Sequence, residues 1–297
     1  MAVRGANANR TYRLSLTYPI WVPLALLAIA VGLRIVDIFL LPLAEAMGEA
    51  FLHKALGFLL VLGYLWAAGR SVQAIGLHGR LAGRALWIGG AGTVLVLLLG
   101  YGLQWVASSA AGKQPALVIT GIDTRTGLTG GLSFALLLVA GNVVNSFMEE
   151  GLFRGINLTH FRMRLGPWRA NLLQAAIFGV WHVAWPIKHL LDGETDLAGA
   201  ASEAGIIVLA SAISGLAWGY LYLKTNSLWA PWLSHMINNT VLNLVHIQTV
   251  GGLDADVTVL YPVITVAYLA MLLWIKVWAA RWGMPEPRPW GTGERTP

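Results

Sequence analysis

Eight apolar stretches, each about as long as a membrane-spanning helix, follow one another along the chain. A helix needs about 20 predominantly apolar residues to cross a bilayer. The fifth and seventh stretches are the weakest, because both carry polar residues in their middle. The pattern predicts an all-α fold, a polytopic transmembrane helix bundle with about eight membrane helices. The stretches lie roughly at 19–41, 52–68, 86–106, 131–152, 170–187, 204–223, 227–246 and 257–279.

These stretches divide the chain into five parts. Residues 1–18 are a basic N-terminus that we expect in the cytoplasm, and 19–130 hold the first membrane helices and their loops, including a long polar loop at 106–130. Residues 131–246 form a core that holds most of the polar residues at membrane depth, and 247–282 hold the last membrane helix. Residues 283–297 are rich in Pro and Gly, and we expect a disordered tail there.

Basic residues gather in alternate loops, which indicates the orientation of the bundle. Cytoplasmic loops carry an excess of Lys and Arg. The pattern predicts that both chain ends are cytoplasmic, and an odd number of spans would mix the two kinds of loop. The basic set is Arg4, Arg10, Arg13, Arg70, Arg80, Arg84, Arg162, Arg164, Arg169, Lys224, Lys276, Arg281, Arg288 and Arg295. The other loops hold Glu45, Glu49, Lys113, Arg125, Lys188, Asp192, Glu194, Asp196, Asp254 and Asp256.

Composition supports an integral membrane protein. The chain is 57% hydrophobic and 11% charged, with a mean hydropathy of +0.64, whereas soluble domains average about 25% charged residues. It has no cysteine, so a disulfide framework and a thiolate zinc site are excluded. The net charge of +6 follows the membrane topology, and we expect no nucleic-acid partner. Abundant Ala, Gly, Leu and Arg favour a prokaryotic inner or plasma membrane.

The fourth apolar stretch ends in GNVVNSFMEEGLFRG, which places ionisable groups at membrane depth. Such groups are costly there, and they usually pair with one another or line a cavity. Glu150 and Arg154 are four residues apart with the acid first, the favourable order for a helical ion pair. We expect Arg154 to neutralise Glu150 and to anchor the helix end near the cytoplasmic face. Glu149 then has no local partner, and a desolvated, unpaired carboxylate suits a general base.

Two further stretches add histidine and asparagine. In the fifth, His182 follows Phe178 by one helical turn. In the seventh, His235, Asn239 and Asn243 recur at intervals of four and share one helix face.

If these helices converge, Glu149, His182, His235 and Asn239 could hydrolyse a bond. The carboxylate would take a proton from water, histidine would orient the water, and His and Asn donors would stabilise an oxyanion. The residues Glu149, His182 and His235 could instead hold zinc, and the sequence leaves both forms open. A purely structural role is the plainer alternative, because His and Asn often bridge membrane helices.

Three motifs together resemble the CPBP family, which comprises CAAX prenyl endopeptidases and bacteriocin-processing (Abi) proteins. They are Glu149-Glu150-x-x-x-Arg154, Phe178-x-x-x-His182 and His235-x-x-x-Asn239, within residues 131–246. The resemblance implies an intramembrane endopeptidase with a helical core. By position it implies Glu149 as base, His182 as helper of the water, and His235 and Asn239 as the oxyanion hole, with Glu150, Arg154 and Phe178 in support. It implies no required cofactor, with zinc as the lesser option, and a membrane-embedded or lipid-anchored substrate, prenylated in some members.

Other classes fit less well. A zincin needs H-E-x-x-H, which is absent. A rhomboid-type serine protease has only Ser133 in a half-fitting G-L-S-F, and it leaves Glu149 and Asn239 unexplained. A proton-coupled transporter could use the same Glu and His residues, but no inverted repeat is visible. A membrane scaffold or immunity factor that binds a peptide in the same cavity also stays open.

Overall fold

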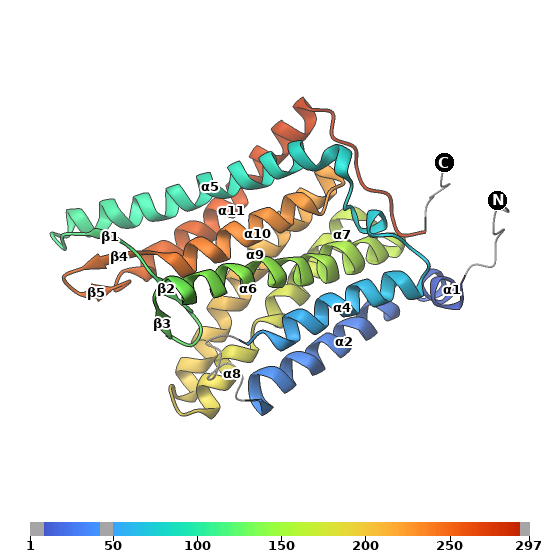
Figure 1. The fold of residues 1–297 in the computed structure, drawn as a ribbon. Coiled ribbons are helices and arrows are strands. Elements are labelled where there is room, and N and C mark those ends of the chain that lie inside the picture. The colour runs from blue at the N-terminus through green and yellow to red at the C-terminus, as the bar shows by residue number, and fades with distance from the viewer. Residues whose placement is uncertain (1–8, 42–49, 292–297) are drawn as a thin grey trace.

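The computed structural model describes residues 9–41 and 50–291 and is a bundle of long helices (Figure 1). In chain order its helices are α1 (Arg10–Thr17), α2 (Trp21–Ile35), η1 (Val36–Leu40), α4 (Leu52–Ala67), η2 (Val72–Ile75), α5 (Gly79–Ala110), α6 (Leu132–Glu150), η3 (Gly151–Leu158), α7 (Thr159–Trp181), α8 (Ala184–Leu191), α9 (Leu197–Thr225), α10 (Trp229–Leu244) and α11 (Val257–Arg281). The strands of the described part are β1 (Ala116–Ile119), β2 (Gly121–Ile122), β3 (Thr129–Gly130), β4 (Val245–Thr249) and β5 (Gly252–Leu253).

All eight predicted apolar stretches fall largely on helices, which confirms the all-α membrane bundle. Helix α4 is apolar but shorter than a full span, and α10 has 16 residues. The described chain begins and ends at the same end of the bundle, as an even number of passes requires (Figure 1). Five helical runs are long and apolar enough to cross a membrane: Trp21–Leu40, Val72–Ala110, Leu132–Leu191, Leu197–Thr225 and Val257–Arg281.

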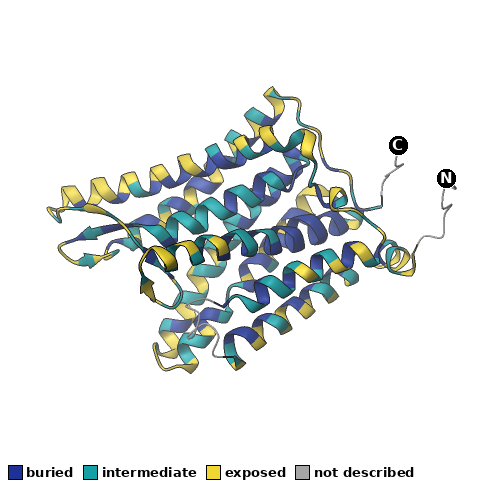
Figure 2. Ribbon diagram, viewed as in Figure 1, coloured by how far each residue is buried: buried dark blue, intermediate teal, exposed yellow. Residues whose placement is uncertain are grey.

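The outer faces of the bundle are apolar and exposed, which identifies them as lipid-facing. On α5 the exposed side chains include Leu95, Leu98 and Leu103, and on α11 they include Val266 and Leu273. Figure 2 shows exposed residues along the outward side of α5 and α2. Soluble monomers rarely expose continuous apolar patches of this kind. The protein is therefore an integral membrane protein.

The run from α6 to α8 makes two passes, because α7 is broken near its middle. Gly166 has a φ of 71°, and Pro167 follows it. Glycine adopts positive φ at little cost, and proline cannot donate the hydrogen bond that would continue the helix. The piece after Pro167 packs along α9. The predicted fourth stretch ends too early at residue 152, since helical structure runs on through η3.

A small β structure replaces part of the expected polar loop at 106–130. Helix α5 continues to Ala110, and the segment after it holds β1, β2 and β3. Strand β1 pairs antiparallel with β4, which also pairs with β5, and β2 pairs with β3. Asn243 of α10 donates to the Ile122 carbonyl at 2.9 Å, which fixes the β2–β3 hairpin against the helix bundle.

A buried histidine beyond the end of α10 gives this β structure a pH dependence. His246 Nδ1 lies 2.5 Å from Asp254 Oδ2. Burial disfavours the imidazolium of His246, but the bond to Asp254 outweighs this effect and raises the pKa of His246. A folded-state pKa above the unfolded one means that the pair stabilises the fold fully below about pH 6.5. That contribution is lost as pH rises through the raised pKa.

His246→Gln is expected to remove part of the decline in stability above about pH 6.5. The measurement is the free energy of unfolding of wild type and variant in detergent, across this pH range. The difference between the two proteins isolates His246 from other titrating groups, such as His189. Parallel pH profiles for wild type and variant would contradict the assignment.

The described part of the C-terminal tail packs against the bundle rather than being disordered. Trp290 is 3% exposed and stacks on His160 with ring centroids 4.4 Å apart. Its Nε1 donates to Ser15 Oγ at 2.8 Å, and Arg162 donates to the Pro287 carbonyl at 2.7 Å. The tail carries a large aromatic side chain that finds a buried partner, which the Pro/Gly composition concealed. Residues 292–297 lie outside the described chain.

Trp290→Phe is expected to lower the free energy of unfolding by about 1 kcal/mol, the net worth of one hydrogen bond. Phenylalanine keeps an aromatic ring but is smaller, so the loss beyond that of the control variant reports on the bond to Ser15. Trp282→Phe is the matched control, since no bond to the Trp282 indole nitrogen is found in the described chain. Equal losses in the two variants, measured by unfolding in detergent, would refute a specific role for the tail contact.

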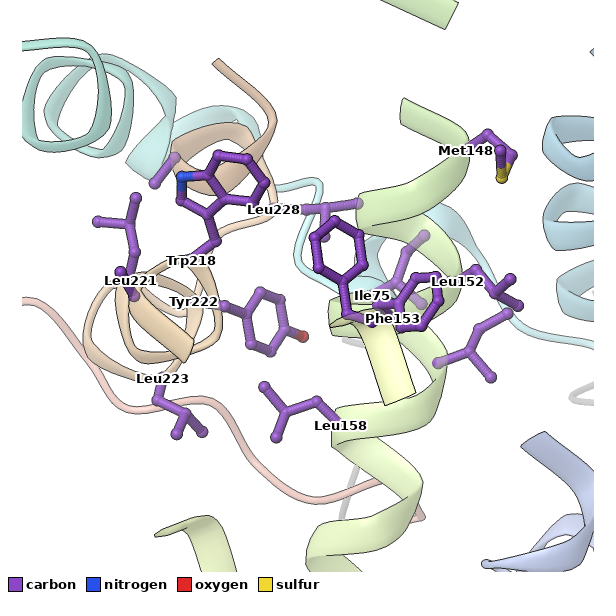
Figure 3. Close-up of a cluster of buried hydrophobic side chains, with 14 of the residues drawn as sticks. Ile75, Met148, Leu152, Phe153, Leu158, Trp218, Leu221, Tyr222, Leu223 and Leu228 are labelled. Carbon is purple, nitrogen blue, oxygen red and sulfur yellow. The ribbon is translucent and has the colours of Figure 1, made fainter. Parts of the chain in front are cut away.

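A cluster of buried side chains between η3 and α9 holds the centre of the bundle (Figure 3). Lipid is as apolar as these side chains, so close packing and small residues hold membrane helices together. Gly215 of α9 provides the close approach. A Cβ there would lie 2.9 Å from the Phe178 ring and 3.2 Å from Arg154 Nη2. The labelled members are Ile75, Met148, Leu152, Phe153, Leu158, Trp218, Leu221, Tyr222, Leu223 and Leu228.

Candidate active site

Glu149 lies near the end of α6 and is almost fully buried, at 1% exposure. Its Oε1 accepts a hydrogen bond of 2.9 Å from Trp181 Nε1, and Arg34 Nη1 lies 3.9 Å from the same oxygen. Its Oε2 makes no hydrogen bond to the described residues and lies 3.7 Å from His235 Nε2. Glu149 has no bonded partner on its own helix within the described chain, as predicted, but its carboxylate is not unpaired, because Trp181 bonds one oxygen while the other is unbonded.

Glu150 and Arg154 form the predicted ion pair, with Arg154 Nη1 3.0 Å from Glu150 Oε1. Arg154 Nη2 also donates to the Gly215 carbonyl at 3.1 Å, and the guanidinium lies 4.3 Å from the Phe178 ring centre. Neither charged side chain is exposed. Arg154 does not lie at a helix end as predicted, because helical structure continues through η3, and its place near the cytoplasmic face stays a prediction. The π-helical turn η3 keeps Arg154 inside the bundle, where Glu150 and a carbonyl satisfy it.

His235 of α10 sits between the two carboxylates. Its Nδ1 lies 2.8 Å from Glu150 Oε1, and its Nε2 faces Glu149 Oε2. The indole of Trp218 stacks on the imidazole with ring centroids 4.2 Å apart. Because a carboxylate oxygen accepts hydrogen bonds, Nδ1 carries the hydrogen in the contact with Glu150. Glu150 therefore orients His235, and Arg154 orients Glu150.

His182 follows the last residue of α7 and is half-buried. Its Nδ1 lies 2.8 Å from the Phe178 carbonyl, so Nδ1 carries the hydrogen and the neutral ring keeps an acceptor at Nε2. The Phe178 ring contacts the imidazole edge-on with centroids 4.8 Å apart. His182 is close enough to Glu149 to interact with it electrostatically. No hydrogen bond joins the two side chains within the described chain, and they come from different helices.

Asn239 lies one turn after His235 and is half-buried. No hydrogen bond within the described chain joins it to Glu149, His182 or His235. Its Oδ1 accepts from Asn238 Nδ2 at 3.1 Å, and Asn238 Oδ1 accepts from the Tyr268 hydroxyl at 3.0 Å. This chain of bonds fixes which way both amides point. The Asn239 NH₂ group is left as the free donor.

Asn243, the third polar residue on the α10 face, bridges helices. Asn142 donates to Asn243 Oδ1 at 3.1 Å, which joins α6 to α10. The structural role of membrane asparagines therefore applies to this pair. The predicted polar face divides between a bridge at its outer end and the groups around Glu149.

The sequence analysis missed Arg34 and Trp181 as partners of Glu149. Arg34 is 4% exposed, and its Cζ lies 4.6 Å from the Trp181 ring centre. It lies inside the first apolar stretch, three residues before the equally buried Asp37. Asp37 in turn accepts from the His53 backbone at 2.8 Å. The sequence signal for this contact was the presence of an arginine and an aspartate within an apolar stretch, where charged residues usually pair or line a cavity.

The zinc alternative does not fit the side chains as they lie. Among the residues that the structure describes, no group of three or more His, Asp or Glu side chains could hold a metal ion. Glu149 Oε2 lies 3.7 Å from His235 Nε2, and the other nitrogen of His235 lies 2.8 Å from Glu150, so both His235 nitrogens already face carboxylates.

Comparison with known proteins agrees with this geometry. Residues 131–241 match the family model described as type II CAAX prenyl endopeptidase Rce1-like. That range contains Glu149, His182, His235 and Asn239. Residues 131–241, which we call the CAAX-type core, are thus similar to the type II CAAX prenyl endopeptidases. The CAAX-type core thus coincides with the part of the bundle where the polar side chains meet.

A curated protein gives a second match. The chain is 25% identical over 115 residues to the "Putative membrane peptidase YdiL" of Bacillus subtilis. The match covers 39% of this chain and 39% of that protein. The similarity thus spans about two fifths of each, and helices α2 and α4 lie outside the family match. No solved structure gives a significant match.

Proposed function

We propose that this protein is an intramembrane endopeptidase that hydrolyses a peptide bond of a membrane-embedded or lipid-anchored protein or peptide. One observation carries the proposal. Within the CAAX-type core, one Glu149 oxygen is held by Trp181 while the other is unbonded and faces His235 Nε2 at 3.7 Å. A fixed carboxylate with one free oxygen suits a general base.

The first step is activation of a water molecule. Glu149 Oε2 takes a proton from the water, whose oxygen attacks the carbonyl carbon of the scissile peptide bond. His182 Nε2 accepts a hydrogen bond from the second O–H of the water and so orients its lone pair towards the carbonyl carbon. A new C–O bond forms, and the electron pair of the carbonyl moves onto its oxygen.

The resulting oxyanion needs hydrogen-bond donors. His235 Nε2–H and the free NH₂ group of Asn239 supply them, and such donors act most strongly where water is excluded. When the intermediate collapses, the C–N bond breaks and the leaving nitrogen takes the proton from Glu149. Water ends as the hydroxyl of the new carboxyl group and one hydrogen on the new amine.

Tyr268 and Asn238 have a positioning role in this scheme. Tyr268 donates to Asn238, and Asn238 donates to Asn239 Oδ1, so the Asn239 amide cannot turn its oxygen towards the oxyanion. Glu150 and Arg154 do the same for His235. Phe178 packs against Arg154, His182 and His235 and so helps to hold these three side chains in place.

Two other functions use the same residues less completely. A transporter needs an alternating path, and a scaffold needs no acceptor left free at Glu149. Neither a transporter nor a scaffold requires the hydrogen bonds that orient the Asn239 NH₂ group. We therefore retain hydrolysis, in a prokaryotic inner or plasma membrane, with the bilayer and a membrane peptide as partners and no nucleic acid.

The test is cleavage of a membrane-peptide library by the purified full chain in nanodiscs. Products are identified by mass spectrometry with and without a chelator, and His182→Ala is run beside wild type. Chelator-resistant cleavage that the variant lacks is the expected result. Chelator-sensitive cleavage restored by zinc would contradict the metal-free scheme. Peptide binding without cleavage, under the same conditions, would favour the scaffold.

A further inference from the structure

Arg34 is a buried cation whose hydrogen-bonding groups are mostly unused. It projects from α2 and is 4% exposed. Nη1 lies 3.9 Å from Glu149 Oε1, which is too long for a hydrogen bond. Nε and Nη2 have no hydrogen-bond partner within the described chain. Buried polar groups are nearly always hydrogen-bonded, so these unused donors call for an acceptor.

The two unused nitrogens are neighbours on one edge of the guanidinium. Nε–H and Nη2–H point in the same direction, and this edge matches the two oxygens of a carboxylate. Nη1, on the other edge, faces Glu149. The guanidinium Cζ lies over the Trp181 ring, 4.6 Å from its centre, in a cation–π contact. Arg34 is thus held by Trp181 while Nε and Nη2 stay buried and without a hydrogen-bond partner in the described chain.

The charges around Arg34 leave this edge without a bonded anion. Glu149 and Asp37 attract Arg34, and Arg125, in the turn between β2 and β3, repels it. Neither carboxylate bonds Nε or Nη2 within the described chain. Asp37 Oδ2 is bonded to the His53 ring at 2.6 Å and to the His53 backbone, and its Oδ1 has no hydrogen-bond partner there.

A role as counter-ion to Glu149 alone explains less. A counter-ion at a buried carboxylate normally makes a direct, charge-assisted bond, as Arg154 does to Glu150 at 3.0 Å. Arg34 does not, and Trp181 bonds the facing Glu149 oxygen instead.

We propose that the Nε and Nη2 edge of Arg34 binds a carboxylate group of the peptide substrate, next to the bond that Glu149 attacks. This inference rests on the proposed endopeptidase function. The carboxylate belongs to a free C-terminus close to the scissile bond or to an acidic side chain. Arg34 is then a specificity-determining residue contributed by a helix outside the CAAX-type core.

Binding of short peptides tests the proposal without turnover. The probes are an acetylated apolar tripeptide with a free C-terminus, the same peptide as its C-terminal amide, and an amidated peptide with one internal glutamate. Each is titrated into the full chain in detergent, and the shift in unfolding temperature gives an apparent Kd. Wild type is expected to favour a carboxylate peptide over the neutral amide by about tenfold or more. The two carboxylate peptides separate a C-terminal from a side-chain source.

The variants are Arg34→Gln, Arg34→Lys and, as a matched surface control, Arg80→Gln. Both Arg34 variants are expected to lose the preference, since lysine keeps the charge but lacks the planar fork. Arg80→Gln should keep it. Equal affinity of wild type for carboxylate and amide, absence of binding by all three peptides, or a preference that survives in Arg34→Lys would overturn the proposal.

The hydrolysis proposal and the carboxylate-binding proposal can be refuted independently. Glu149→Gln keeps Arg34 and is expected to keep the carboxylate preference while losing cleavage. A carboxylate preference in a protein that cleaves nothing would refute only the hydrolysis. Cleavage that treats carboxylate and amide peptides alike, in wild type and in Arg34→Lys, would refute only the role of Arg34.

Discussion

Replacing Glu149 by glutamine is expected to lower the rate of peptide cleavage by about 10²–10⁴-fold, the usual contribution of a general base. Glutamine has nearly the same shape, and its amide oxygen can still accept from Trp181. The change therefore removes the base while it preserves packing. The measurement is kcat and KM for a cleaved membrane peptide, together with the unfolding temperature of the variant in detergent.

Glu203→Gln is the control for this first prediction. Glu203 of α9 is a partly exposed carboxylate that pairs with His189 of α8. It should leave kcat unchanged. A Glu149→Gln protein that is folded and cleaves at the wild-type rate would show that another group activates the water.

Replacing Arg154 by methionine is expected to destabilise the fold by about 3–5 kcal/mol, the cost of breaking a buried ion pair by removing one partner. Glu150 would keep its charge in a site without solvent, and the Gly215 carbonyl would lose its donor. The free energy of unfolding in a denaturing detergent titration measures the effect. Activity should fall as well, since Glu150 orients His235.

The matched control for this second prediction is Arg80→Gln, because Arg80 is exposed at the end of the bundle. Its effect should stay within about 0.5 kcal/mol. A second variant, Glu150→Gln with Arg154→Met, removes both charges and should recover part of the loss. If Arg154→Met is as mild as the surface change, the ion pair is not a structural element of the fold.

Local sequence signals predicted the helices and the Glu150–Arg154 pair. Apolar runs of sufficient length form helices in lipid because every backbone group must be bonded internally. The spacing of four between Glu150 and Arg154 is fixed by helical geometry, and the pair formed as expected. The full burial of Arg154 was not predicted, because Gly215, its second acceptor, lies on α9 and is distant in sequence.

Contacts between distant segments explain the remaining differences. Arg34 and Glu149 approach each other only because α2 packs on the core. The periodicity of the first and fourth apolar stretches does not predict this contact. The same holds for Trp290 on His160 and for the pairing of β1 with β4. In each case the contact joins residues that are far apart in sequence, so a local sequence pattern could not predict it.

The most direct test of the central claim is cleavage of a membrane peptide in ¹⁸O-labelled water by wild type and Glu149→Gln, under single-turnover conditions. We predict that wild type releases two fragments and that the new C-terminal carboxylate of one carries one ¹⁸O atom. Glu149→Gln should release neither fragment on the same timescale. Labelled products formed equally fast by both proteins would contradict a water activated by Glu149.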